Sequence, residues 1–130
     1  MSQENVEIIR ALWRAFERGR VPADAFADEV EWHTATDMPD AETCKGVQAI
    51  RQMLAVGWEN TLDPGLAAEE FMDAGEQVVV RWRGWGTGRV SKVPIDWNEA
   101  HLYELREGKV VEVREYRSWT QALEAAGLAD

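Results

Sequence analysis

The spacing of apolar residues changes period once along this 130-residue chain, from helical in its first half to strand-like in its second. Apolar side chains return every three or four positions over residues 6–16 and again over residues 47–58, and a break at Asp63-Pro64-Gly65 is expected to follow the second of these helices. From residue 66 onward, short apolar runs are separated by turn sequences at Asp73-Ala74-Gly75, at Gly84 to Gly88 and at Glu107-Gly108. This order predicts helices followed by a four-stranded meander, which is an α+β fold.

Shorter signals place the remaining elements. Gly19 ends the first helix, and Pro22 can open a second, short helix because a proline at the first helical position loses no needed hydrogen bond. Residues 30–34 are expected to form a strand, and the polar segment from residue 35 to 45 a loop. A capping box at residues 118–121 predicts a short closing helix.

Composition narrows the classes of protein to which the chain can belong. Fourteen basic against 24 acidic residues give a formal charge of −10, which repels nucleic-acid phosphates and anionic lipids, so neither nucleic acid nor a membrane is expected as a partner. The length fits a single domain over residues 1–130. Cys44 has no second cysteine to pair with and the N-terminus resembles no secretory signal, so we expect a cytoplasmic location.

Four short strings, in this order, resemble the SnoaL-like branch of the nuclear transport factor 2-like superfamily. They are residues 15–19 (AFERG), residues 28–33 (DEVEWH), residues 45–50 (KGVQAI) and residues 107–111 (EGKVV), the last leading to Tyr116. The resemblance implies a cone: a strongly curved, mostly antiparallel sheet wrapped around three to four helices, with an open end that admits apolar ligands. It also implies a homodimer packed through the outer sheet face, which would include Leu102, Val110 and Tyr116.

The Glu107-Gly108 turn determines which residues of the last two strands face each other. With a three-residue loop, the more apolar face, expected to point inward, carries three facing pairs: His101 with Glu115, Tyr103 with Val113, and Leu105 with Val111. A two-residue loop would shift this register by one and make His101 and Glu115 diagonal neighbours.

His101 and Glu115 are therefore the candidate catalytic residues. Burial raises the pKa of a carboxyl group toward neutrality, where it can exchange protons with a substrate or with a neighbouring imidazole. The competing interpretation is that the two side chains only satisfy each other as a buried hydrogen-bonded pair. The hairpin resembles that of SnoaL-type cyclases, which carry a histidine and an aspartate at these two positions. In this chain His101 matches the histidine, but Glu115, one methylene longer, stands in place of the aspartate.

Other activities of the superfamily match the sequence less well. The ketosteroid isomerase pattern needs an aspartate where this chain has Trp32 and a tyrosine where it has Leu12. The limonene epoxide hydrolase pattern needs acids on the strand that here reads Arg81-Trp82-Arg83. The superfamily also includes members without catalytic activity, so a non-catalytic ligand-binding or dimerisation module is the alternative function.

Seven tryptophans are many for a chain of this length, and aromatic walls suit flat, apolar ligands. The residues expected to border the pocket are Trp13, Trp32, Trp58, Trp97, Trp119 and Tyr103. Alternatively, the rings fill the cone and leave little space. His33 follows Trp32 as a packed or rim residue, and no close ligand pair such as His-x-His appears, so neither a metal nor a cofactor is expected.

Overall fold

The computed structural model describes residues 2–35, 39 and 41–128. Its elements are α1 (Ser2–Phe16), the short 3-10 helix η1 (Ala23–Ala25), β1 (Phe26–His33), β2 (Thr43–Lys45), α2 (Val47–Glu59), β3 (Thr61–Ala74), β4 (Gln77–Gly88), β5 (Pro94–Arg106), β6 (Lys109–Tyr116) and α3 (Trp119–Ala125). The predicted order of helices and the four-stranded meander are thus present. The second helix is reduced to the three residues of η1, with Pro22 as its N-cap, and the strand expected over residues 30–34 begins already at Phe26. The segment expected to be a loop contributes β2, which pairs with β1.

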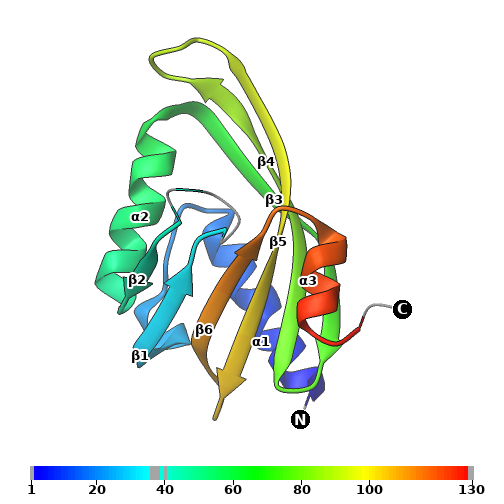
Figure 1. Cartoon of the computed structure of the whole chain (residues 1–130). Helices are drawn as coiled ribbons and strands as arrows, with labels where there is room; N and C mark the ends of the chain where they lie inside the picture. The colour runs from blue at the N-terminus through cyan, green and yellow to red at the C-terminus, as the bar shows by residue number, and fades with distance from the viewer. Residues whose placement is uncertain (1, 36–38, 40, 129–130) are drawn as a thin grey trace.

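The strands form one curved sheet in the order β2-β1-β6-β5-β4-β3 (Figure 1). The pairing of β1 with β6 is parallel, and the other neighbouring pairs are antiparallel. Helix α1 packs on the concave face, where Ile9, Leu12 and Trp13 are buried against Trp32 and Tyr103. This confirms the predicted cone-shaped α+β fold. Within the described part of the chain, no helix is long and apolar enough to cross a membrane.

Helix α3 covers part of the convex face, on the side of the sheet opposite α1 (Figure 1). It begins where Ser118 accepts a hydrogen bond from the backbone N–H of Gln121 at 3.1 Å, as the capping sequence predicts. Its Ala122 packs with Val79, Ala100 and Leu102. Leu102 is therefore already covered within the chain and is 4 % exposed, which removes it from the surface expected for a dimer.

The β5–β6 hairpin differs from the expected loop, yet it keeps the expected pair. The loop has two residues, Glu107 and Gly108, both with positive φ, as in the tight turns that join twisted antiparallel strands. A register shift on the β6 side then places Leu105 opposite Val110 and leaves Val111 as the extra residue of a β-bulge. The expected Leu105–Val111 pairing is wrong, and Val110 is buried in the concave core instead of on the outer face.

Because the bulge adds back the residue that the tighter turn removes, the register beyond it returns to that expected for the longer loop. His101 lies opposite Glu115, and Tyr103 lies opposite Val113. Residues 101, 103, 113 and 115 therefore all face the inside of the cone.

Two breaks expected from the sequence lie inside strands. Asp63-Pro64-Gly65 falls in β3, where the register with β4 shifts between Leu62 and Gly65 and Asp63 has a φ of 50°. Gly84 to Gly88 belongs to β4, and the chain turns after it, around residues 89–93. The strands therefore extend further toward the open end of the cone than the glycine pattern suggests.

Candidate active site

An apolar cavity of about 320 Å³ lies within the cone, between α1, α2 and the concave face of the sheet. Six of the seven tryptophans border it: Trp13, Trp32, Trp58, Trp82, Trp85 and Trp97. His101, Glu99 and Glu115 are the titratable residues on its wall. The rings thus surround a space instead of filling it, and its volume is at the lower end of the range for small-molecule sites.

Glycines on neighbouring strands make room for two of these indole rings. Gly65 pairs with Trp85, and a Cβ added to Gly65 would lie 2.1 Å from the Trp85 ring. Gly84 pairs with Trp97, and its added Cβ would lie 3.2 Å from that ring. Each ring therefore lies across the backbone of the adjacent strand. At Gly65 only glycine permits so close an approach, whereas at Gly84 a Cβ would need the Trp97 ring to shift by a few tenths of an ångström. Trp85 and Trp97 are each 38 % exposed, which places them where the cavity meets solvent.

A buried chain of hydrogen bonds determines the state of His101. Trp13 Nε1 donates to the Tyr103 hydroxyl at 3.1 Å, and that hydroxyl lies 2.9 Å from His101 Nδ1. Since the indole N–H can only donate, the tyrosine oxygen accepts from it and is free to donate its own proton to Nδ1. His101 then carries its hydrogen on Nε2.

The surroundings of His101 keep it neutral. Its ring is 4 % exposed and packs against Trp13, Trp32 and Trp82 at centroid distances of 5.7, 5.2 and 5.3 Å. Burial lowers the pKa of His101 to about 3, because an imidazolium ion there would lose its hydration. At neutral pH the residue is therefore a hydrogen-bond donor and not a charged acid.

Glu115 is a half-buried carboxyl group on the same wall. It accepts a hydrogen bond from Trp32 Nε1 at 2.6 Å. Burial raises its pKa, and the hydrogen bonds from Trp32 and from the backbone of Ala35 oppose that rise without cancelling it. The pH at which the Glu115 carboxyl group gains or loses its proton is therefore shifted toward neutrality.

His101 and Glu115 face each other across β5 and β6 but have different hydrogen-bond partners. His101 uses Nδ1 for Tyr103, while its Nε2 has no partner among the described residues. The interpretation in which the two side chains simply satisfy each other is therefore wrong. Trp82 Nε1 is the second buried polar atom that lacks a partner in the described part of the chain.

Six of the eight residues named from the sequence border the cavity: Trp13, Trp32, Trp58, Trp97, His101 and Glu115. Tyr103 is wholly buried behind the wall, where it orients His101. Trp119 lies on the convex face with α3, beside the Arg81 guanidinium at 5.7 Å, so its expected place in the pocket is wrong. That error has a simple cause, since Trp119 begins a helix packed outside the sheet.

Sequence reasoning missed Trp82 and Trp85 as wall residues. The alternation Val78, Val80, Trp82 in β4 indicates the inward position of Trp82, because alternate strand residues share a face. Trp85 also borders the cavity, although it stands three positions after Trp82 and so does not follow this alternation.

The fold and the cavity together define a cone-shaped α+β protein of the nuclear transport factor 2-like kind. The chain belongs to the SnoaL-like domain family, whose model matches residues 9–113. No functionally curated protein matches it.

Solved structures with the same fold cover almost the whole chain. A nuclear transport factor 2-like protein of unknown function from Burkholderia pseudomallei is 21% identical, covers 93% of this chain and 95% of its own, and has a TM-score of 0.76. TerC, co-crystallized with polyporic acid, is 20% identical, with coverages of 95% and 98% and a TM-score of 0.72. A Catenulispora acidiphila protein of ketosteroid isomerase-like fold, solved with trimethylamine, is 20% identical, with coverages of 94% and 93% and a TM-score of 0.72.

Proposed function

We propose that this chain binds a small, flat, apolar or aromatic molecule in the cone cavity and catalyses a proton transfer on it, with Glu115 as the acid/base group. The observation that carries the proposal is a half-buried carboxyl group of raised pKa on the wall of an apolar cavity bordered by six indole rings. A ligand in that space would displace water from around the carboxyl group and stack on aromatic faces.

Two N–H groups of residues that border the cavity indicate what the ligand carries. His101 Nε2 and Trp82 Nε1 are N–H donors buried just behind the cavity surface, and neither has a partner among the described residues. A buried donor without an acceptor costs about 1–3 kcal/mol, and a carbonyl or phenolate oxygen on the ligand would recover part of that cost. We therefore expect the ligand to be an aromatic or enone-like molecule with at least one carbonyl oxygen.

Glu115 and His101 would have different roles in the reaction. Glu115 would remove a proton from a carbon flanked by carbonyl groups, and the negative charge that develops on the carbonyl oxygen would be stabilised by the neutral His101 N–H. The reaction class is then isomerisation, cyclisation or elimination without a cofactor. The co-crystal of TerC with polyporic acid supports the view that this fold accommodates an organic ligand.

Proton exchange tests the catalytic part without knowledge of the natural substrate. Benzoylacetone, a flat aromatic 1,3-diketone, is incubated with the protein in D₂O, and loss of the proton at the carbon between the carbonyls is followed by NMR. We expect exchange above the buffer rate, and a loss of about 100-fold in the Glu115→Gln variant, the lower end of what general base catalysis contributes. Glu70→Gln, which removes an exposed glutamate on β3, is the matched control. Equal exchange in Glu115→Gln and in the control would contradict the assignment.

Tryptophan fluorescence tests binding separately. Because Trp32, Trp58 and Trp97 border the cavity, a bound aromatic diketone should quench their emission, whereas Trp119 on the convex face should not respond. Replacing the three by phenylalanine should reduce the quenching without abolishing it, because Trp13, Trp82 and Trp85 also border the cavity. Quenching without proton exchange would favour the alternative function, a non-catalytic ligand-binding or dimerisation module.

Two further expectations belong to the proposal. We infer a homodimer, on the resemblance to the superfamily, formed by the part of the convex face that α3 leaves open. We also infer a cytoplasmic location, on the single cysteine, which has no partner for an internal disulfide. Cell fractionation would test the location, and sedimentation would test the dimer.

A further inference from the structure

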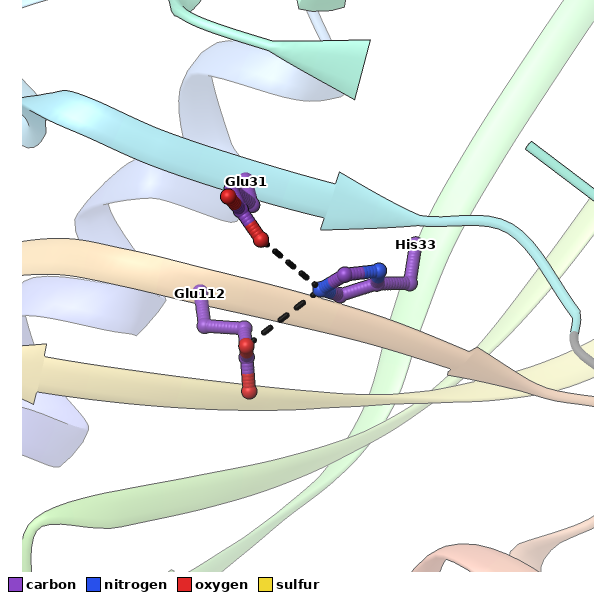
Figure 2. Close-up of side chains that lie close together, drawn as sticks. All are labelled: Glu31, His33 and Glu112. Atoms are coloured by element: carbon purple, nitrogen blue, oxygen red, sulfur yellow. Dashed lines mark hydrogen bonds and ion pairs between the residues drawn. The ribbon is translucent and has the colours of Figure 1, made fainter. Parts of the chain in front are cut away.

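Three side chains outside the cavity direct ligand atoms at one point on the convex face (Figure 2). Glu31 and His33 stand two positions apart on β1, so they share a face, and Glu112 lies opposite Glu31 on β6. His33 Nε2 is 3.5 Å from Glu31 Oε1 and 3.3 Å from Glu112 Oε2. The three ligand atoms all lie within 4.8 Å of one another.

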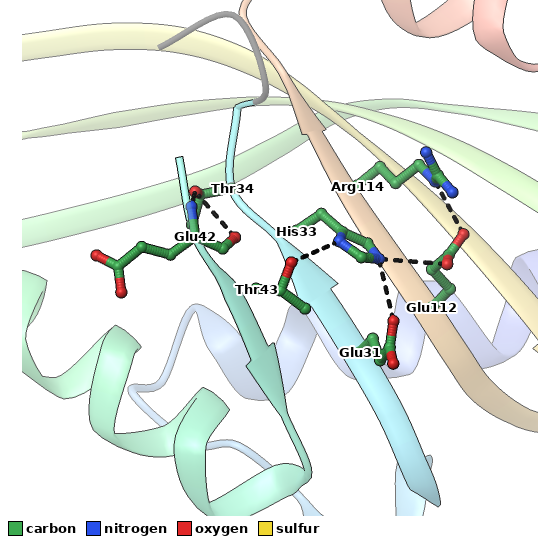
Figure 3. Close-up of polar contacts among 7 residues, drawn as sticks. All are labelled: Glu31, His33, Thr34, Glu42, Thr43, Glu112 and Arg114. Carbon is green, nitrogen blue, oxygen red and sulfur yellow. Dashed lines mark hydrogen bonds and ion pairs between the residues drawn. The ribbon is translucent and has the colours of Figure 1, made fainter. Parts of the chain in front are cut away.

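The other ring nitrogen of His33 is held by a threonine. Nδ1 lies 3.0 Å from the Thr43 hydroxyl oxygen on β2 (Figure 3). When Nδ1 donates its hydrogen to that oxygen, Nε2 is left with a bare lone pair directed at the two carboxylates. A hydrogen bond of this kind from the outer nitrogen is the usual way in which proteins orient a metal-binding histidine.

Three electron-rich atoms this close together favour a cation between them. Glu31 and Glu112 are opposite in the parallel register, and like charges that face each other in a sheet destabilise it. Arg114 binds Glu112 through Oε1 at 2.8 Å and so leaves Oε2 directed at His33 (Figure 3). Lys45 lies opposite Glu31 in the register of β2 with β1. The point between the three ligand atoms can be occupied either by a proton on His33 or by a metal ion.

We propose that Glu31, His33 and Glu112 bind one divalent transition-metal ion, with zinc as the best match, on the convex face of the sheet. The distances favour a tetrahedral ion, because bonds of about 2.0–2.2 Å separate neighbouring ligands by about 3.3–3.6 Å. Both measured distances from His33 Nε2 fall in this range. A nitrogen ligand also favours zinc over calcium or magnesium, which take oxygen ligands.

The site would join two parts of the fold that are distant in the sequence. Two of its ligands come from β1 and one from β6, so the ion would bridge the parallel strand pair. The side chains are 20–40 % exposed, which leaves the fourth position open to water. Sequence spacing alone did not reveal this set, since Glu112 joins the Glu31-x-His33 pair only through the strand pairing.

Zinc titration of the untagged full chain, followed by calorimetry and by NMR of the histidine rings, tests the proposal. We expect one Zn²⁺ per chain and a rise in the thermal unfolding midpoint when Zn²⁺ is added. The chain has two histidines, so the NMR localises the ion directly: the His33 ring signals should shift while those of buried His101 stay in place. Co²⁺ in place of Zn²⁺ should give the visible absorption of a tetrahedral complex.

Variants supply the second arm of the test. His33→Gln should weaken Zn²⁺ binding by about 100-fold, and Glu31→Gln by at least about 10-fold, by comparison with the effects of second-shell changes. Glu70→Gln, which removes the same charge from β3 at the far edge of the sheet, should leave the affinity unchanged. Binding of equal strength in His33→Gln would place the ion elsewhere and overturn the proposal. Absence of Zn²⁺ binding in the wild type would overturn it too.

Discussion

Acid should destabilise this protein through His101, and the size of the effect follows from its burial. The imidazole titrates near 6.5 when unfolded, whereas in the cone its pKa falls to about 3. Between these values the unfolded chain binds a proton that the native chain does not, so stability is complete above about pH 6.5 and is lost as pH falls. At about pH 4.5 the loss corresponds to about two pH units, or about 2–3 kcal/mol.

His101→Gln removes this loss while preserving the local hydrogen bond. The glutamine amide oxygen can accept from Tyr103 in place of Nδ1, and the side chain does not titrate. Urea unfolding of both proteins at about pH 7 and about pH 4.5 gives four free energies of unfolding. We expect the wild type to lose about 2–3 kcal/mol more than the variant on acidification. Equal losses would refute the assignment of a neutral, buried His101.

Two predictions address other features. Tyr103→Phe should destabilise the protein by about 2–4 kcal/mol, because it strands the buried Trp13 N–H and His101 Nδ1; Tyr116→Phe is the control, and urea unfolding is the measurement. Sedimentation at micromolar concentration should show a dimer, and a monomer at every concentration would remove the homodimer from the proposal.

The fold could be predicted because local signals agreed with one another. Helical spacing over residues 6–16, a strand meander after residue 66 and a capping serine at residue 118 all point to the observed elements. The breaks at Pro64 and Gly84 were misread, because a glycine or proline inside a long twisted strand produces the same sequence pattern as a turn.

The pairing of His101 with Glu115 was predicted through two errors that cancelled. The expected loop was one residue too long, and the bulge at Val111, for which no local sequence rule gives a position, restored the register. What could not be predicted was the partner of each polar atom. Tyr103 rather than Glu115 holds His101, because contacts between α1 and β5 depend on packing across the cone and not on hairpin register.

Glu115 should make the native protein less stable at neutral pH. Its proposed role in proton transfer would explain why the chain keeps it. Its native pKa is raised, so the native chain holds a proton over a window above 4.5 in which the unfolded chain has released it. The stability this provides is complete at low pH and is lost as pH rises through that window, which is opposite in sign to the effect of His101.

Replacing Glu115 by glutamine tests this trade-off. Glutamine keeps an acceptor for Trp32 Nε1 and cannot ionise, so Glu115→Gln should unfold at higher urea than the wild type at about pH 7 and at the same urea at about pH 4. Glu70→Gln, which breaks an exposed ion pair with Arg81, should cost at most about 1 kcal/mol at either pH. A Glu115→Gln variant that is less stable than the wild type at neutral pH would show that the carboxylate is a structural group. Glu115 would then lose its assignment as a catalytic acid, because a catalytic residue is expected to keep its charge in the site at a cost to folding.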